Sequence, residues 1–316
     1  MLHILTRYFA LVVVAVFLFN CSAESSKPII LTTSFPAASI IKELVGNRVE
    51  VEILVPAGAS PHTYAPKPSD IKKSSIAIAF ISIAENLDGW SKDIKTNRHI
   101  ELIKFLPDSL KVYFDTPHAH NHDGHDHHGH DHEGHNHGAE EPTNKDDLLD
   151  PHFWFDPFAV KAILKPLADT LSSIMPENAD AIRKNVELFS KRLDLIHKEV
   201  SSMSKSLFGK PLFLQHPSVL YFANRYNLEY MGSIEEIPGK EPSPKYIAEI
   251  AKKIRESGAT AIFTEPQLNK KAAEIMAQEA GVLLYELDPV GGTDKIKNYS
   301  DLILNNAKVL VNALGK

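Results

Sequence analysis

Residues 176–209, which read PENADAIRKNVELFSKRLDLIHKEVSSMSKSLFG, form the stretch that decides the fold. Apolar side chains recur along it at helical spacing, at Ile182, Val186, Phe189, Leu193, Ile196 and Val200. Pro176 stands near the expected first turn, where proline is tolerated. A helix from about Glu177 to Ser206 would have about 30 residues and would span about 45 Å. That length predicts a rod that bridges two lobes.

Short apolar strands alternate with amphipathic helices on both sides of this stretch. Before it, we expect strands at 29–35, 49–56, 76–82 and 100–105, and helices at 36–46 and through 162–174. After it, we expect strands at 211–216, 228–234, 260–266 and 282–289, and helices at 218–226, 243–258, 269–281 and 294–314. Such alternation is typical of open parallel sheets. The sequence therefore predicts an α/β fold with two Rossmann-like lobes joined by one long helix.

The N-terminal residues indicate export. An apolar run from Phe9 to Phe19 follows a short region that carries Arg7. Eleven residues are too few to cross a hydrocarbon core about 30 Å thick. The pattern is typical of a signal peptide, expected at residues 1–20, although a buried N-terminal helix is the alternative.

Cys21 is the only cysteine of the chain, which excludes an intramolecular disulfide. It lies just after the apolar run, where bacterial lipoprotein signals place the cysteine that becomes lipidated. Leu18 fits that pattern, whereas Asn20 stands where a small residue is usual. We expect lipidation at Cys21 and a short tether over residues 21–27.

The composition is that of an ordinary globular protein. The 316 residues are 43% hydrophobic and 23% charged, with a net charge of −6. This length suffices for two lobes. The mild negative charge offers no basic face for nucleic acid, so no such partner is expected.

Residues 117–142, PHAHNHDGHDHHGHDHEGHNHGAEEP, contain ten of the 16 histidines. The segment has almost no apolar residue, so burial cannot offset the entropy of ordering it, and we expect a loop that is disordered without metal. Neutral imidazoles bind Zn²⁺. Auxiliary metal ligands are therefore expected at His118, His120, His122, His125, His127, His128, His130, His132, His135 and His137. The alternative is a solvated spacer without a metal role.

Four other metal-capable side chains lie where an open α/β sheet binds its ligands, at strand ends and at a helix start. They are His62, His152, His216 and Asp288. Each alone could be a structural residue, or a turn residue in the case of Asp288. Two come from each half, so a site built from all four would lie in the cleft between the lobes. Three imidazoles and one carboxylate suit tetrahedral Zn²⁺ better than Mn²⁺, which prefers oxygen.

The segments around these residues resemble the metal-binding lipoproteins of ABC importers for zinc and manganese (cluster A-I solute-binding proteins, ZnuA/TroA-like). The matching stretches follow the family's order and are PAGASPHTYAPKPSDIKK, DPHFWFDP, LQHPSVLYFANRYNL, KEPSPKYIAEIAKKIRESGATAIFTEPQ and VLLYELDPVGG. The resemblance implies two α/β lobes joined by a single rigid helix, with ligands at His62, His152, His216 and Asp288. Manganese members tend to carry glutamate at the third of these positions, whereas this chain has histidine. Pro217 and Val219 depart from the family's pattern.

The resemblance also implies a function. It predicts a monomeric, extracytoplasmic binding protein, lipid-anchored at Cys21, that captures Zn²⁺ and delivers it to an ABC permease driven by an ATPase. Glu265 is a weaker candidate for supporting a ligand from outside the site. Because binding needs neutral histidines, affinity is expected to fall below about pH 6.5.

Three alternatives remain open at this point. A metal-sequestering surface lipoprotein or adhesin would have the same fold and site, and a Mn²⁺-specific importer component would differ only in its metal. An enzyme is not favoured, because four protein ligands would leave no position for an activated water. The histidine run also contains no HExxH motif. Its stretch HHGHDH misses by one residue the HxHxDH spacing of metallo-hydrolases.

These expectations divide the chain into five parts. They are a signal peptide (1–20), a lipid tether (21–27), an N-terminal lobe (28–175) with a histidine-rich loop (117–142), a linking helix (176–206) and a C-terminal lobe (207–316).

Overall fold

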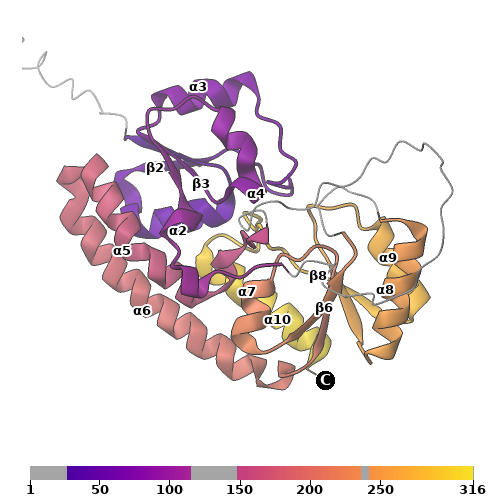
Figure 1. Ribbon diagram of the computed structural model, residues 1–316. Helices are drawn as coiled ribbons and strands as arrows, with labels where there is room; N and C mark the ends of the chain where they lie inside the picture. Colours follow the sequence, from indigo (N-terminus) through magenta and orange to yellow (C-terminus); the bar gives the residue numbers. More distant parts are fainter. Residues whose placement is uncertain (1–26, 115–147, 236–241, 316) are drawn as a thin grey trace, which may run out of the picture.

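The computed structural model describes residues 27–114, 148–235 and 242–315, which form two α/β lobes beside a pair of long helices (Figure 1). The expected signal peptide, Cys21 and the histidine run lie outside these residues. No helix in the described ranges is long and apolar enough to cross a membrane.

The first lobe contains a parallel sheet in the order β2-β1-β3-β4. Its strands are β1 (Ile29–Thr32), β2 (Glu50–Ile53), β3 (Ala79–Ser82) and β4 (His99–Glu101). Helices α2 (Phe35–Val45), α3 (Pro68–Ile76) and α4 (Glu85–Asp88) connect them. All four residues of β3 are buried, as expected for a continuous apolar run in a parallel sheet.

The fourth strand is shorter than the sequence suggests. We expected a strand over 100–105, but the chain leaves β4 after Glu101 and forms a 3-10 turn at Leu102–Phe105. Leu102 and Ile103 are both buried in this turn. Neighbouring residues of a strand point to opposite faces, so the turn places two consecutive apolar side chains in the core at the sheet edge.

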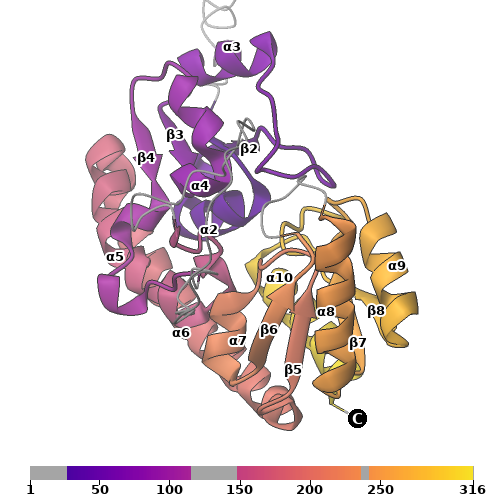
Figure 2. The same ribbon diagram turned by 45° about the vertical axis from the view of Figure 1, so that its right-hand side comes forward.

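Two long helices pack side by side along both lobes (Figure 2). They are α5 (Pro157–Ile174) and α6 (Ala179–Met203). Short 3-10 turns at Pro176–Asn178 and Ser204–Leu207 extend α6 at both ends, so the helical segment covers the span expected from the sequence. The stripe on α6 packs as predicted, because Ile182, Phe189, Leu193, Ile196 and Val200 are buried.

The second lobe repeats the plan of the first, with a parallel sheet in the order β6-β5-β7-β8. Its strands are β5 (Pro211–Leu214), β6 (Glu229–Ser233), β7 (Ala261–Thr264) and β8 (Leu283–Glu286). The helices are α7 (Leu220–Tyr226), α8 (Pro244–Glu256), α9 (Lys271–Ala280) and α10 (Tyr299–Leu314). Helix α10 begins later than position 294 because the Asn298 side chain caps it, accepting a hydrogen bond from the Asp301 N–H.

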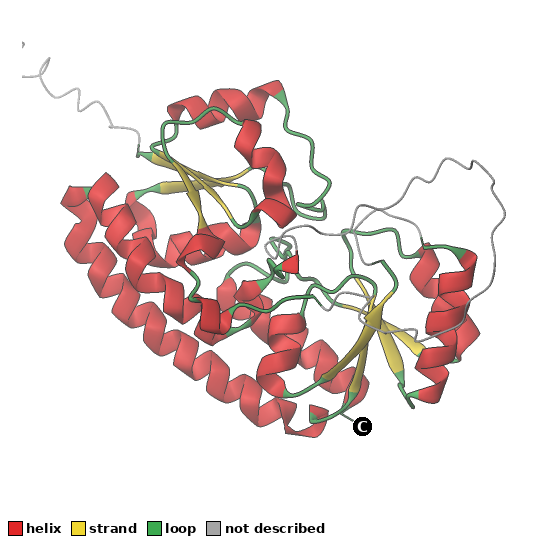
Figure 3. Ribbon diagram, in the orientation of Figure 1, coloured by secondary structure: helices red, strands yellow, loops and turns green. Residues whose placement is uncertain are grey.

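One hydrophobic core runs through both lobes and the helices between them. It includes Ile40 of α2, Phe189 of α6 and Leu302 of α10, and α6 contacts both α2 and α10. The outer face of the second sheet packs separately against α8 and α9, which flank it on the side away from α6 (Figure 3). Because the linking helix belongs to a close-packed core, it holds the two lobes as a stiff unit.

Candidate metal site

Three histidines meet where the lobes face each other. His62 lies in the loop after β2, and His216 follows β5. His152 lies directly before the 3-10 turn Phe153–Phe155, which leads into α5. His152 and His216 thus project from next to the ends of regular elements, whereas His62 reaches the site from within a loop.

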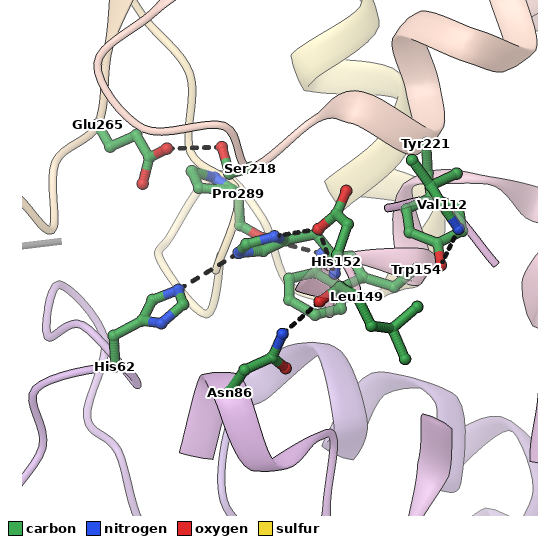
Figure 4. Close-up of polar contacts among 11 residues, drawn as sticks. His62, Asn86, Val112, Leu149, His152, Trp154, Ser218, Tyr221, Glu265 and Pro289 are labelled. Atoms are coloured by element: carbon green, nitrogen blue, oxygen red, sulfur yellow. Dashed lines mark hydrogen bonds and ion pairs between the residues drawn. The ribbon is translucent and has the colours of Figure 1, made fainter. Parts of the chain in front are cut away.

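The three imidazoles form a compact cluster. One ring nitrogen of each lies within 4.8 Å of those of the other two. The ring centroids of His62 and His216 are 4.9 Å apart, and those of His152 and His216 are 5.2 Å apart. The Nε2 atoms of His62 and His152 are 3.4 Å apart and face each other (Figure 4). Two nitrogens on a tetrahedral Zn²⁺ with bonds of about 2.0–2.1 Å would be about 3.3 Å apart, so this pair is already spaced as zinc ligands would be.

His216 is an orphaned polar group. It is 4% exposed, and neither ring nitrogen makes a hydrogen bond within the described part of the chain. The backbone of Glu235 favours the charged form of the ring and is the smallest of the influences on its pKa. Buried polar atoms without partners are uncommon, and each calls for an explanation such as an ion.

Burial favours the neutral form of His62 and of His216. Burial and, to a smaller extent, the neighbouring His152 together lower the pKa of His62 to about 3, against a smaller opposite effect from the backbone of Asn86. Burial, followed by His62 and His152, also lowers the pKa of His216 well below its ordinary value. Neutral imidazoles offer lone pairs to a metal. Competition from protons should therefore begin at lower pH than the ordinary histidine value suggests.

Asp288 lies outside this cluster. It follows β8 and is partly buried, and its Oδ1 accepts hydrogen bonds from Gln267 Nε2 (2.7 Å) and the Gly291 N–H (2.8 Å). The Asp288 N–H donates a hydrogen bond to Asn306 Oδ1, and Asn306 Nδ2 donates one to the Asp288 carbonyl oxygen, both at 2.8 Å. The structure thus brings together three of the four candidate ligands, whereas the fourth takes part in a separate hydrogen-bond network.

Glu265 lines the cavity next to the histidines. Burial raises its pKa to about 8, and the Ser218 hydroxyl, which donates a 2.5 Å hydrogen bond to Oε1, partly opposes this shift. Figure 4 shows Glu265 turned toward Ser218. No hydrogen bond links Glu265 to the three histidines in the described residues, so its supporting role stays a prediction.

The cavity at the cluster has a volume of about 10 Å³, which suits one ion or one water molecule. Trp154 and Pro289 line it, and the Trp154 indole N–H donates to the Pro289 carbonyl at 3.1 Å. The sequence analysis did not single out these residues, nor Asp150, which bonds to the His152 ring. The motif DPH, which places Asp150 two residues before His152, is the sequence signal that could have revealed this contact.

Comparisons with known proteins agree with this architecture. The family described as "Zinc-uptake complex component A periplasmic" (ZnuA) matches residues 30–313. The high-affinity zinc uptake system protein ZnuA of Brucella suis biovar 1 is 32% identical over 89% of this chain and 90% of its own length. The zinc-binding protein AdcA of Streptococcus pyogenes serotype M3 is 31% identical over 83% of this chain, which spans about half the length of that relative. A crystal structure of ZnuA superposes with a TM-score of 0.71 at 25% identity and covers 91% of this chain and 99% of its own. With a family match over nearly all of its length, the chain belongs to the ZnuA family of periplasmic zinc-uptake components.

Proposed function

We propose that this protein captures Zn²⁺ in the cleft between its lobes and delivers it to an ABC permease for uptake. The observation that carries the proposal is the convergence of His62, His152 and His216, with neither ring nitrogen of His216 hydrogen-bonded in the described residues. Burying imidazole nitrogens that lack a partner, as in His216, costs free energy unless a cation uses their lone pairs. Zn²⁺ is the substrate here, and the role is binding and delivery rather than catalysis.

Asp288 is the proposed fourth ligand. The Gly291 N–H and the amide of Gln267, which lines the cavity at the histidines, both donate to its Oδ1 and would fix the orientation of its carboxylate. Three nitrogens and one oxygen would fill a tetrahedral Zn²⁺ shell. Mn²⁺ prefers more oxygen donors, which makes it the less suitable substrate.

The remaining parts of the proposal concern partners and location. Membership of a zinc-uptake family supports an ABC permease and its ATPase as partners. The apolar run that ends before Cys21 supports export and a lipid anchor at that cysteine, on the outer side of a bacterial membrane. The protein would act there as a monomer. Replacing Cys21 with serine should move the exported protein from the membrane fraction to the soluble fraction.

The ten histidines from His118 to His137 would collect zinc outside the cleft. Their proposed affinity is lower, because a segment with almost no apolar residue gains no burial to offset the entropy of ordering it around an ion, whereas the folded lobes position the histidines of the cleft. The cleft and the histidine run are thus expected to differ in both stoichiometry and affinity.

Competitive chelator titration tests the proposal. Zinc stoichiometry and affinity would be measured on the chain from residue 22 onward, and on the same chain without residues 118–137. The deletion should keep one tight site, His62→Ala should abolish that site, and His197→Ala, which changes a histidine on α6 away from the cleft, should leave it intact. Loss of all tight binding on deletion would show that the histidine run is the functional site and would overturn the proposal.

A further inference from the structure

Asp150 is an acidic residue with 0% exposure whose contacts converge on His152. Its Oδ1 accepts a hydrogen bond from the ring Nδ1 of His152 at 2.7 Å and another from the His152 backbone N–H at 2.9 Å. Its Oδ2 has no hydrogen bond within the described part of the chain. Among the described residues, the Asp150 side chain therefore hydrogen-bonds to His152 alone, and it lies on the side of the His152 ring opposite His62.

We propose that Asp150 is a positioning residue that holds His152 ready for the metal and sets the zinc affinity of the cleft. A carboxylate only accepts hydrogen bonds, so the hydrogen of the neutral imidazole is on Nδ1 and the lone pair is on Nε2. That Nε2 is the atom that lies 3.4 Å from Nε2 of His62. The inference rests on the proposed function, because it concerns the affinity of the same site.

The unpaired oxygen gives the proposal a second line of support. Burying a carboxylate with one oxygen unsatisfied destabilises a protein unless a positive charge lies nearby. Zn²⁺ on Nε2 would supply that charge across the imidazole, and carboxylates that orient metal-bound histidines typically strengthen binding by 10–100-fold. Asp150 is thus expected to destabilise the zinc-free protein and to stabilise the zinc-bound one.

The backbone around Asp150 explains how it is held. Residues 112–114 and 148–150 pair in antiparallel fashion, with an isolated bridge between Tyr113 and Leu149. The Phe114 N–H donates to the Leu148 carbonyl at 2.7 Å, and the Asp150 N–H donates to the Val112 carbonyl at 2.9 Å. We call this pairing the clasp. It fixes the backbone of Asp150 two residues before the ligand.

Both lobes hold the clasp in place. The side-chain amide of Asn86, on α4 of the first lobe, donates to the Leu149 carbonyl. The Val112 N–H donates at 3.1 Å to the hydroxyl of Tyr221, on α7 of the second lobe. Figure 4 shows these contacts on either side of His152. The position of His152 therefore depends on contacts from both lobes, transmitted through the clasp and Asp150.

The chain enters and leaves the segment 115–147, which contains the ten histidines, through this clasp. Deleting residues 118–137 removes none of the contacts described above. An effect of Asp150 on zinc affinity should thus be equally large with and without that deletion, which separates the cleft from the histidine run.

The test uses Asp150→Asn, which keeps the shape and removes the charge, and Asp150→Ala, which removes both. Zinc affinity by chelator competition should fall about 10-fold for Asn and up to about 100-fold for Ala. Thermal unfolding of the zinc-free Asn variant should occur at the same temperature as wild type or higher. Long-range ¹H–¹⁵N NMR should show His152 protonated on Nδ1 in the zinc-free wild type and a mixture of tautomers in Asp150→Ala.

His152→Ala distinguishes a failure of the proposed function from a failure of the proposed role of Asp150. If it leaves tight zinc binding intact, the proposed function itself is wrong. If it abolishes binding while Asp150→Asn and Asp150→Ala stay within twofold of wild type, only the role of Asp150 is overturned. Loss of zinc affinity together with a lower unfolding temperature and an unchanged His152 tautomer would also overturn it, because that outcome indicates a purely structural residue.

Discussion

Phe35 of the first lobe packs against the backbone of Gly291 in the second lobe. A Cβ atom placed on Gly291 would lie 2.9 Å from two ring carbons of Phe35 and 2.8 Å from Cγ2 of Ile296. Gly291 also has a φ of +73°, which side chains rarely adopt, and its N–H donates to Asp288. One residue thus takes part both in the contact between the lobes and in the orientation of the proposed fourth ligand.

Gly291→Ala is therefore expected to weaken zinc binding and to destabilise the fold. The left-handed backbone should cost about 1 kcal/mol, and the clash with Phe35 about 1–3 kcal/mol more. Gly281→Ala is the matched control, since Gly281 has a φ of +72° with nothing within 4 Å of an added Cβ. Denaturant unfolding and zinc titration of both variants measure the difference. Equal losses of stability, with no change in zinc affinity, would show that the Phe35 contact is unimportant.

His216→Leu should abolish tight zinc binding without destabilising the zinc-free protein. Leucine fills a similar volume and removes two buried nitrogens that lack hydrogen bonds in the described residues. We expect the free energy of unfolding without zinc to stay the same or rise by about 1 kcal/mol. The stabilisation that zinc gives to wild type should disappear. Calorimetry with and without zinc is the measurement, and a variant still stabilised by zinc would show that His216 is not a ligand.

The sequence predicts the lobes and the linking helix because both depend on strong local patterns. The apolar residues of α6 recur at helical spacing, and β3 is a continuous apolar run, so each segment's own sequence indicates its structure. The start of α10 was less predictable, since the Asn298 cap depends on one side-chain contact. The end of β4 depends on which side chains the edge of the sheet buries, which no local pattern specifies.

The candidate site was predictable in its residue types but not in its geometry. His62, His152 and His216 were found because each follows a strand or precedes a helix at the ligand-binding edge of a sheet. The role of Asp150 arises from the clasp, whose partners Val112 and Asp150 are far apart in the chain. Sequence spacing cannot reveal such a pairing. The separate network around Asp288 is likewise a product of tertiary contacts.

Asp288→Asn and Glu265→Gln should affect zinc affinity unequally. Asp288 is the proposed fourth ligand, so losing its charge should weaken zinc binding about 10-fold or more. Glu265 is buried and already accepts a hydrogen bond from Ser218, so Glu265→Gln should change affinity less than about threefold. Zinc titration of the two isosteric variants decides between them. The reverse order would make Glu265 the fourth ligand in place of Asp288.

Asp88 should give the stability of this protein a distinct pH dependence. Burial raises its pKa to about 6, although the Thr33 hydroxyl and the N–H groups of Ile83 and Ala84 favour the charged form. Between the ordinary value of 3.8 and about 6, the folded protein therefore binds more protons at this residue than the unfolded chain does. The contribution of Asp88 to stability is fully present below that window and is lost as pH rises through it, by up to about 3 kcal/mol. Denaturant unfolding of wild type and Asp88→Asn from about pH 4 to pH 7 isolates the effect, because the histidines titrate in both proteins. The difference in unfolding free energy should shift in favour of the variant as pH rises, and a difference that stays constant with pH would show that Asp88 titrates alike in the folded and unfolded chains.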